Sequence, residues 1–153
     1  MIRKILLFVL FFMGSTAFCT AGEKRPDFDF SSPELTDQYE QAVPNPEQVR
    51  WVLLVPNKTA HKQVHHELDQ QGDAWLKEKK MIVMVDISGM PSLITKFIAL
   101  PKMRNYRYKI YLDRDEHWVS HWAQELSVVE IVDGHPGKVQ TIHNFAQLRS
   151  LVD

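Results

Sequence analysis

Two short apolar runs constrain the fold of this chain more than any other feature. Residues 81–87 (MIVMVDI) are apolar at six of seven positions, with no alternation of polar and apolar side chains. That pattern is typical of a strand covered on both faces, as in a parallel sheet between helices. Residues 49–55 (VRWVLLV) form a similar run that stops at Pro56-Asn57. We therefore predict two buried strands inside an α/β fold.

The segment between these strands has the spacing of a helix. Its apolar residues recur every four positions: Ala60, Val64 and Leu68. Thr59 stands where a helix N-cap is expected, and Gly72-Asp73 predicts a break before Trp75. Trp51 and Trp75 are large and largely apolar, so we expect both in the core.

A second helix is predicted after the second strand. Residues 88–91 (SGMP) open it, because a proline in the first turn lacks only an N–H that has no partner there. Its apolar stripe consists of Leu93, Ile94, Phe97 and Ile98. The residue before a proline is biased away from helical geometry, so we expect the helix to stop before Pro101.

The rest of the chain supplies further strands and a last helix. The expected elements are a third strand at 108–112, a helical turn within 116–123, a hairpin of 127–132 and 138–143 around a turn at 133–137, and a closing helix that carries Phe145, Leu148 and Val152. Alternating strands and helices imply right-handed parallel crossovers, whereas the hairpin adds antiparallel strands. We predict a three-layer α/β/α sandwich with a mixed sheet and a C-terminal β-hairpin plus helix.

The N-terminus has the features of a secretory signal peptide. Arg3 and Lys4 precede nine apolar residues at 5–13, and small residues follow at 14–17 and 19–21. Nine apolar residues are too few to span a bilayer, which needs about 20, so we predict no integral membrane anchor. Cleavage after Ala21 or after Ala17 both fit, and acylation of Cys19 is the alternative, disfavoured by the bulky residue before it. We assign 1–21 to the signal peptide, 22–48 to an extended lead-in with at most a short hairpin at 35–43, and 49–153 to the folded domain.

Charge and cysteine content exclude several functions. The net charge of -1 gives no reason to expect nucleic acid as a partner. One cysteine excludes a disulfide framework and an intramolecular dithiol couple. Removal of residues 1–21 takes away two of the 18 basic and none of the 19 acidic residues, which leaves a net charge of -3. If cleavage follows Ala21, it also takes away the cysteine, and we then expect a periplasmic or secreted mature protein that has none.

This order of elements resembles the thioredoxin-like superfamily, in the redoxin branch that includes exported thiol reductases and peroxiredoxins. The resemblance covers residues 27–153 and includes the "LD-x-D" turn at 112–115 (LDRD) and a "D-G" turn at 133–134. It implies a thioredoxin-like sandwich with a C-x-x-C pair after the first buried strand and a cis-proline before a later one. This chain has 57–62 (NKTAHK) and Ser127 at those places. Thiol–disulfide exchange needs a thiolate, so we predict no such activity.

A narrower similarity involves the second half of the chain. Residues 90–94 (MPSLI), 101–104 (PKMR) and 106–108 (YRY) are similar to small exported bacterial proteins, some of which carry the name FAD/FMN-containing dehydrogenase. A flavin enzyme is therefore one hypothesis. The chain has six glycines and no G-x-G-x-x-G after its first strand, so we predict no cofactor.

Histidines offer a candidate metal site. His61 and His65 are four residues apart on the first predicted helix, and Asp69 continues the same stripe. Imidazoles and a carboxylate at this spacing can chelate Zn²⁺, Cu²⁺ or Ni²⁺, with copper bound most tightly. The alternative is that these side chains border the apolar stripe without binding anything. His117 and His121 repeat the spacing, but their tryptophan neighbours are expected to pack while the histidines face water.

Residues 102–109 (KMRNYRYK) interleave four basic residues with tyrosines. Such a segment can bind phosphates, stack on bases or contact anionic lipid headgroups. The structural alternative is a solvated connection whose tyrosines fold back on the core.

Polar residues at strand ends form a candidate ligand pocket. Ligands gather at the C-terminal ends of strands in open parallel sheets, so a pocket left from the redox site is predicted from these residues: Asn57, Lys58, Thr59, Asp86 and Ser127. The alternative for an aspartate such as Asp86 or Asp113 is to cap a helix or fix a turn. The sequence shows no motif that pairs a general acid with a general base, so it gives no indication of acid–base catalysis.

We therefore favour an exported, non-catalytic thioredoxin-like module that binds a protein or peptide of the cell envelope. A periplasmic metal-binding protein that uses His61 and His65 is the alternative.

Overall fold

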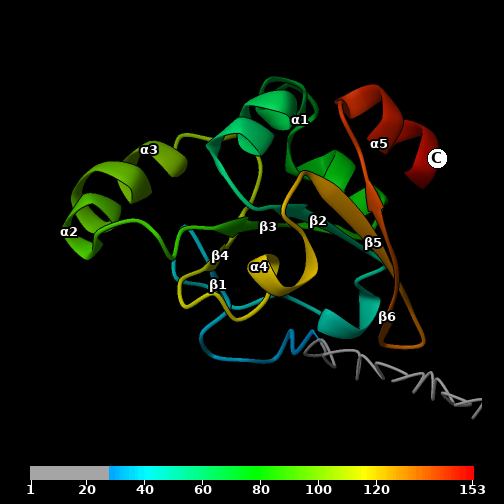
Figure 1. Ribbon diagram of the computed structural model, residues 1–153, viewed down its shortest axis with the longest axis horizontal. Helices are drawn as coiled ribbons and strands as arrows, with labels where there is room; N and C mark the ends of the chain where they lie inside the picture. The colour runs from blue at the N-terminus through cyan, green and yellow to red at the C-terminus, as the bar shows by residue number, and fades with distance from the viewer. Residues whose placement is uncertain (1–27) are drawn as a thin grey trace, which may run out of the picture.

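The two apolar runs form adjacent parallel strands in the middle of a six-stranded sheet (Figure 1). The structure is a computed structural model in which residues 28–153 are described, so the predicted signal peptide lies outside the described residues. Strand β2 (Trp51–Val55) pairs in parallel with β3 (Met81–Asp86), and the strand order is β1-β4-β3-β2-β5-β6. The other strands are β1 (Thr36–Asp37), β4 (Tyr111–Asp113), β5 (Ser127–Val132) and β6 (His135–Thr141).

The helical elements follow the order that the sequence predicts. They are η1 (Pro46–Gln48), α1 (Lys58–Glu78), α2 (Ser92–Ile94), η2 (Thr95–Ala99), α3 (Leu100–Met103), α4 (Val119–Trp122) and α5 (Phe145–Val152). Strands β2, β3 and β4 are parallel, β5 and β6 form an antiparallel hairpin, and α5 closes the chain. This arrangement confirms the predicted α/β sandwich with a mixed sheet, which is a thioredoxin-like fold. Within the described residues, no helix is both long and apolar enough to cross a bilayer.

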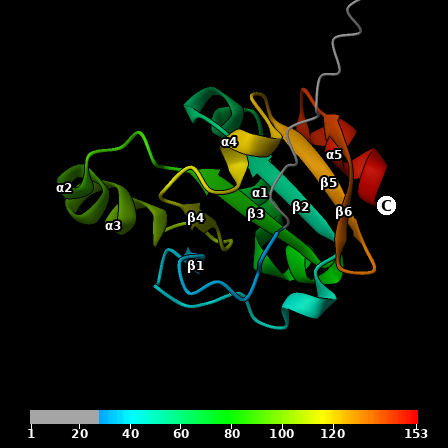
Figure 2. The same cartoon turned by 60° about the horizontal axis from the view of Figure 1, so that its bottom comes forward.

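Each face of the sheet carries its own hydrophobic core, which explains why β2 shows no alternation. Trp51, Leu53 and Val55 of β2 pack under α1 and α5, whereas Val52 and Leu54 point to the other face. That second face is covered by α4 and by the segment 28–49, which wraps below the sheet (Figure 2). The covering residues from these two segments include Phe28, Phe30, Leu35, Val43, Trp118 and Trp122. The segment predicted as a lead-in therefore contributes to the core from residue 28 onward.

Helix α1 is interrupted where the sequence predicts a break. Gly72 has φ +72° and ψ -177°, a conformation that only glycine adopts without strain. The kink turns the N–H of Asp73 outward, and this group donates to the carbonyl of Arg107 at 2.9 Å. An ideal Cβ at position 72 would lie 3.4 Å from the same carbonyl oxygen. The break thus creates a docking point for the connection between α3 and β4.

The second predicted helix differs most from expectation. It does not stop before Pro101 but continues from Ser92 to Met103. Proline lacks the N–H for a regular helical bond, and the π-helical turns of η2 just before it accommodate that gap. Its predicted apolar stripe is exposed, because the helix extends past the edge of the sheet and only its last turn reaches the core, through Leu100 (Figure 1).

The third strand is shorter than predicted, and two other boundaries move. Strand β4 begins at Tyr111, because the backbone at Tyr108 and Ile110 is paired with the side chain of Gln38 instead of with a strand. Asn57, not Thr59, caps α1: its Oδ1 accepts from the N–H of Ala60 at 2.9 Å. In the hairpin, a tight two-residue turn at 133–134 with two positive φ angles lets β6 begin early, at His135.

Candidate functional site

A groove opens at the C-terminal end of β2, between the first turn of α1 and the start of β5. Its volume is about 360 Å³. The lining residues come from the start of α1, from the segment before β5 and from the end of β6: Asn57, Thr59, Ala60, Gln63, Gln124, Glu125, Leu126, Ile142 and His143. We call it the strand-end groove.

The sheet order explains why these distant segments meet. Strand β2 runs antiparallel to β5, so the end of β2 lies beside the start of β5, with Leu54 opposite Ser127. The N–H of Ile142 donates to the carbonyl of Leu126 at 2.9 Å, which holds the end of β6 against the start of β5. The side chain of Asn57 spans the remaining gap with a weak bond to the carbonyl of Gln124 at 3.4 Å.

Two of the five residues predicted for the pocket line the groove, and three lie elsewhere. Asn57 and Thr59 contribute to it. Lys58 is exposed at the start of α1. Asp86 turns to its own loop, where its Oδ1 accepts from the N–H and the hydroxyl of Ser88. Ser127 is buried, and its hydroxyl donates to the carbonyl of Glu125 at 3.0 Å.

The chemistry of the strand-end groove is that of a binding surface. Its side chains offer carboxamides at Gln63 and Gln124, a hydroxyl at Thr59 and an imidazole at His143, above apolar contacts from Leu126. No cysteine occurs among residues 28–153. The groove can therefore exchange hydrogen bonds with a ligand, and it holds no thiolate for disulfide chemistry.

The predicted metal ligands on α1 belong to a second cluster, on the side of the helix that faces the connection to β4. We call it the His–Tyr cluster: His61, His65, Tyr106 and Tyr108. The two imidazole rings are stacked, with centroids 4.7 Å apart. Nδ1 of His65 lies 2.8 Å, and Nε2 of His61 lies 3.3 Å, from the hydroxyl of Tyr108. A neutral hydroxyl satisfies both nitrogens by donating to one and accepting from the other.

The tyrosines are positioned by hydrogen bonds from outside the sheet. Gln38 is fully buried; its amide donates to the carbonyl of Tyr108 at 3.0 Å and its Oε1 accepts from the N–H of Ile110 at 3.0 Å. Oδ1 of Asp69 accepts from the N–H of Arg107 at 2.8 Å. The tyrosines of this segment therefore fold back on the core, as the structural alternative expects, while Lys102 and Arg107 stay exposed.

Burial keeps this cluster uncharged. It lowers the pKa of His61 to about 4, and repulsion from His65, when that ring is protonated, and from Lys102 acts in the same direction. The pKa of His65 is also lowered, again mainly by burial, although the nearby Asp69 carboxylate opposes the shift. Burial raises the pKa of Tyr108 far above its usual value. Both imidazoles are therefore neutral at pH 7.

This electrostatic arrangement predicts an acid-sensitive stability. The unfolded chain binds a proton at His61 near pH 6.5, whereas the folded chain does so only near pH 4. Between these values the unfolded state holds more protons, so the free energy of unfolding falls as the pH drops through this window. The full shift corresponds to about 3 kcal/mol; because the ring is only partly buried, we expect about 1–2 kcal/mol.

Urea unfolding at about pH 7 and at about pH 4.5 measures this loss, with the variant His61→Gln as the comparison. The variant does not titrate at position 61, so it is expected to lose less stability than the wild type between the two pH values. Equal losses in both proteins would show that His61 does not bear the acid sensitivity.

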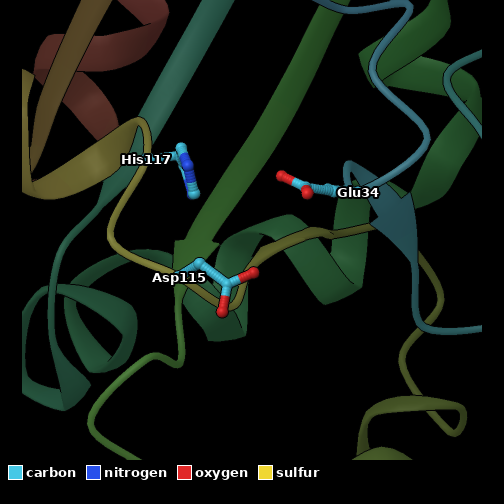
Figure 3. Close-up of side chains that lie close together, drawn as sticks. All are labelled: Glu34, Asp115 and His117. Atoms are coloured by element: carbon cyan, nitrogen blue, oxygen red, sulfur yellow. The ribbon is translucent and has the colours of Figure 1, made fainter.

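The predicted three-ligand set on α1 is not assembled as a compact site. Oδ1 of Asp69 is bound to the backbone of Arg107, and the three residues do not bring ligand atoms within 4.8 Å of one another. Among residues 28–153, the one set that does is Glu34, Asp115 and His117, at the opposite face of the sheet (Figure 3). All three side chains are exposed. Sequence spacing gave no signal for this set, because Glu34 lies in the segment 28–49, far from the other two.

The structural alternative offered by the sequence holds for three further residues: His117, His121 and Asp113. Trp118 and Trp122 are buried while His117 and His121 are exposed, as expected. Asp113 is fully buried at the end of β4 and fixes the turn that leads into α4: its carboxylate accepts from the backbone N–H groups of His117, Trp118 and Val119, at 2.8–3.0 Å.

Comparisons with known proteins find matches among solved structures alone. No protein-family model and no curated protein matches the sequence. One of the matching structures is the solution structure of a putative protein disulfide isomerase from Bacteroides thetaiotaomicron, with a TM-score of 0.48 and 20% sequence identity, over 84% of this chain and 82% of that one. The assignment of the fold rests on the strand order and directions described above.

Proposed function

We propose that this chain is a non-catalytic thioredoxin-like module of the cell envelope that binds a protein or peptide in the strand-end groove. The observation that carries the proposal is the position and chemistry of that groove. It lies where the resemblance to redoxins places a C-x-x-C pair, and its described lining residues offer amide, hydroxyl and imidazole groups in place of thiols. A site of this kind retains recognition without the redox step.

The geometry favours an extended peptide as the ligand. The groove lies between the first turn of α1 and the segments 124–126 and 142–143, which approach it as irregular backbone outside the sheet. Its rim offers side chains that donate and accept hydrogen bonds, whereas Ala60, Leu126 and Ile142 provide buried apolar contacts. A main chain with one apolar side chain matches this combination. The location in the envelope rests on the signal peptide predicted from residues 1–21.

Photocrosslinking in producing cells tests the proposal. A benzophenone amino acid replaces Thr59 in the groove, and the control replaces Lys138, which is exposed on the hairpin away from the groove. We expect a discrete adduct of higher mass from position 59 and none from position 138. A second variant, Gln63→Arg, places a bulky charge at the rim and is expected to weaken the adduct. Equal labelling from both positions, or no adduct from position 59, would contradict peptide binding in the groove.

Metal binding by His61 and His65 is the alternative function, and the cluster geometry supports testing it. Two neutral imidazoles present ring nitrogens to the same hydroxyl, at 2.8 and 3.3 Å from Tyr108, and neutral imidazole is the form that binds Cu²⁺ or Zn²⁺. Calorimetry with Cu²⁺ on tag-free chain should then show binding that is lost in the double variant His61→Ala and His65→Ala. Retention of binding in that variant with loss in Glu34→Ala would place the metal at the exposed set instead.

A further inference from the structure

The segment from Ser92 to Met103, which we call the arm, carries an exposed apolar face. It is one continuous stretch of helical backbone formed by α2, η2 and α3. Leu93 is 69% exposed, Phe97 67% and Ile98 60%. Four of the seven large apolar side chains exposed among residues 28–153 lie between Leu93 and Ile98. Figure 1 shows the arm reaching beyond the edge of the sheet, away from α5.

The structure leaves this face without a partner inside the molecule. Only the last turn of the arm packs against the core, through Leu100 and Met103. An exposed cluster of aliphatic and aromatic side chains is unfavourable in water and marks an interaction surface. The strand-end groove is a separate site, because none of its lining residues belongs to the arm.

Charge identifies the kind of surface that the arm fits. Residues 87–112 contain five basic residues and no acidic one. Lys96 and Lys102 are exposed and form no ion pair with any described residue. The ammonium group of Lys96 lies 5.8 Å from the ring centroid of Phe97, so a positive charge accompanies the most exposed aromatic side chain.

We infer that the arm binds the surface of an anionic lipid bilayer, with Leu93, Phe97 and Ile98 in the interface and Lys96 and Lys102 at the phosphates. Helices that lie in a membrane interface combine apolar side chains with lysines in this way, and each basic residue near an anionic surface strengthens binding. Protein interfaces, in contrast, are depleted of lysine. This attachment is peripheral and does not depend on the peptide groove.

Depth-dependent quenching tests the inference directly. The full chain with Cys19→Ser carries a single new cysteine at Ile98→Cys, labelled with an environment-sensitive dye, and the control carries the label at Lys138→Cys. Vesicles contain phosphatidylcholine with brominated acyl chains, either alone or mixed with phosphatidylglycerol. We expect quenching only at position 98 and only with phosphatidylglycerol, reversed by high salt.

Matched variants without a label separate the arm from other contributions, since all of them share residues 1–27. Phe97→Ser is expected to weaken binding to the phosphatidylglycerol vesicles about tenfold. The control Val132→Ser, at a side chain that is 53% exposed on the hairpin, should leave binding unchanged. Lys96→Glu with Lys102→Glu should weaken binding by at least about tenfold.

Three outcomes would overturn the inference. Equal quenching with neutral vesicles would show that charge does not direct binding, and no quenching at position 98 would show that attachment occurs elsewhere. A change in the dye signal that depends on protein concentration in the absence of vesicles would assign the face to a second copy of the chain.

Discussion

Replacement of Asp113 by alanine is expected to lower the free energy of unfolding by about 3–5 kcal/mol. The carboxylate is fully buried and accepts from the backbone N–H groups of His117, Trp118 and Val119. Each buried donor left without a partner costs about 1–3 kcal/mol. The loss also releases the first turn of α4, which holds Trp118 and Val119 against the second face of the sheet.

Urea denaturation followed by tryptophan fluorescence measures this effect. The matched control is Asp115→Ala, two residues further on, because its side chain is exposed and a surface substitution changes stability by only about 0.5 kcal/mol. Asp113→Asn keeps one oxygen acceptor and should fall between the two. If Asp113→Ala proved as stable as Asp115→Ala, the Asp113 carboxylate would not hold the start of α4.

Replacement of Gly72 by alanine is the second large effect, with an expected loss of about 1–3 kcal/mol. A side chain at φ +72° and ψ -177° is strained, and its Cβ would also contact the carbonyl oxygen of Arg107 at 3.4 Å. Relief of the strain would require α1 to straighten, which would remove the bond from the N–H of Asp73 to Arg107. The His–Tyr cluster depends on the same connection, so it should loosen together with the helix.

Thermal unfolding and near-ultraviolet circular dichroism measure the two consequences for Gly72→Ala. Gly89→Ala serves as the control, because no atom lies within 4 Å of a Cβ placed there and its φ angle is not positive. We expect a lower midpoint and a weaker tyrosine signal for Gly72→Ala only. Similar midpoints for the two variants would contradict the role of the kink.

Local pattern predicted the parts of the fold in which local and tertiary preferences agree. The continuous apolar run of β3, the four-residue spacing of α1 and the stripe of α5 all face cores that bury them. The break at Gly72 was also readable, because glycine is the residue that permits it. In each case the physical cause lies within a few positions of the residue concerned.

The predictions of secondary structure were wrong where a side chain from a distant part of the sequence makes the hydrogen bonds expected from a neighbouring strand. Residues 108–110 have the composition of a strand, yet Gln38 takes the hydrogen bonds that a neighbouring strand would have made. The arm was predicted as a helix with an apolar stripe, but such a stripe does not specify whether it faces a core or an external surface. Its exposure therefore became visible only with the structure.

The candidate sites, too, could be predicted from the sequence only in part. Helical spacing correctly placed His61 and His65 on one side of α1, but their partner Tyr108 comes from a connection that sequence could not position. Asn57 and Thr59 lie in the predicted groove, whereas Asp86 and Ser127 are turned to their own backbone neighbours, as short polar side chains often are.

The central claim is that this chain has a thioredoxin-like fold and binds a protein or peptide, but carries out no redox chemistry. The most direct measurement is turnover of a protein disulfide and of hydrogen peroxide by the purified chain, with dithiothreitol as the reductant. Residues 28–153 contain no cysteine, so we expect rates equal to those of dithiothreitol alone, both for the wild type and for Cys19→Ser. Turnover above that background in either protein would contradict the claim, and its loss in Cys19→Ser would assign the chemistry to Cys19.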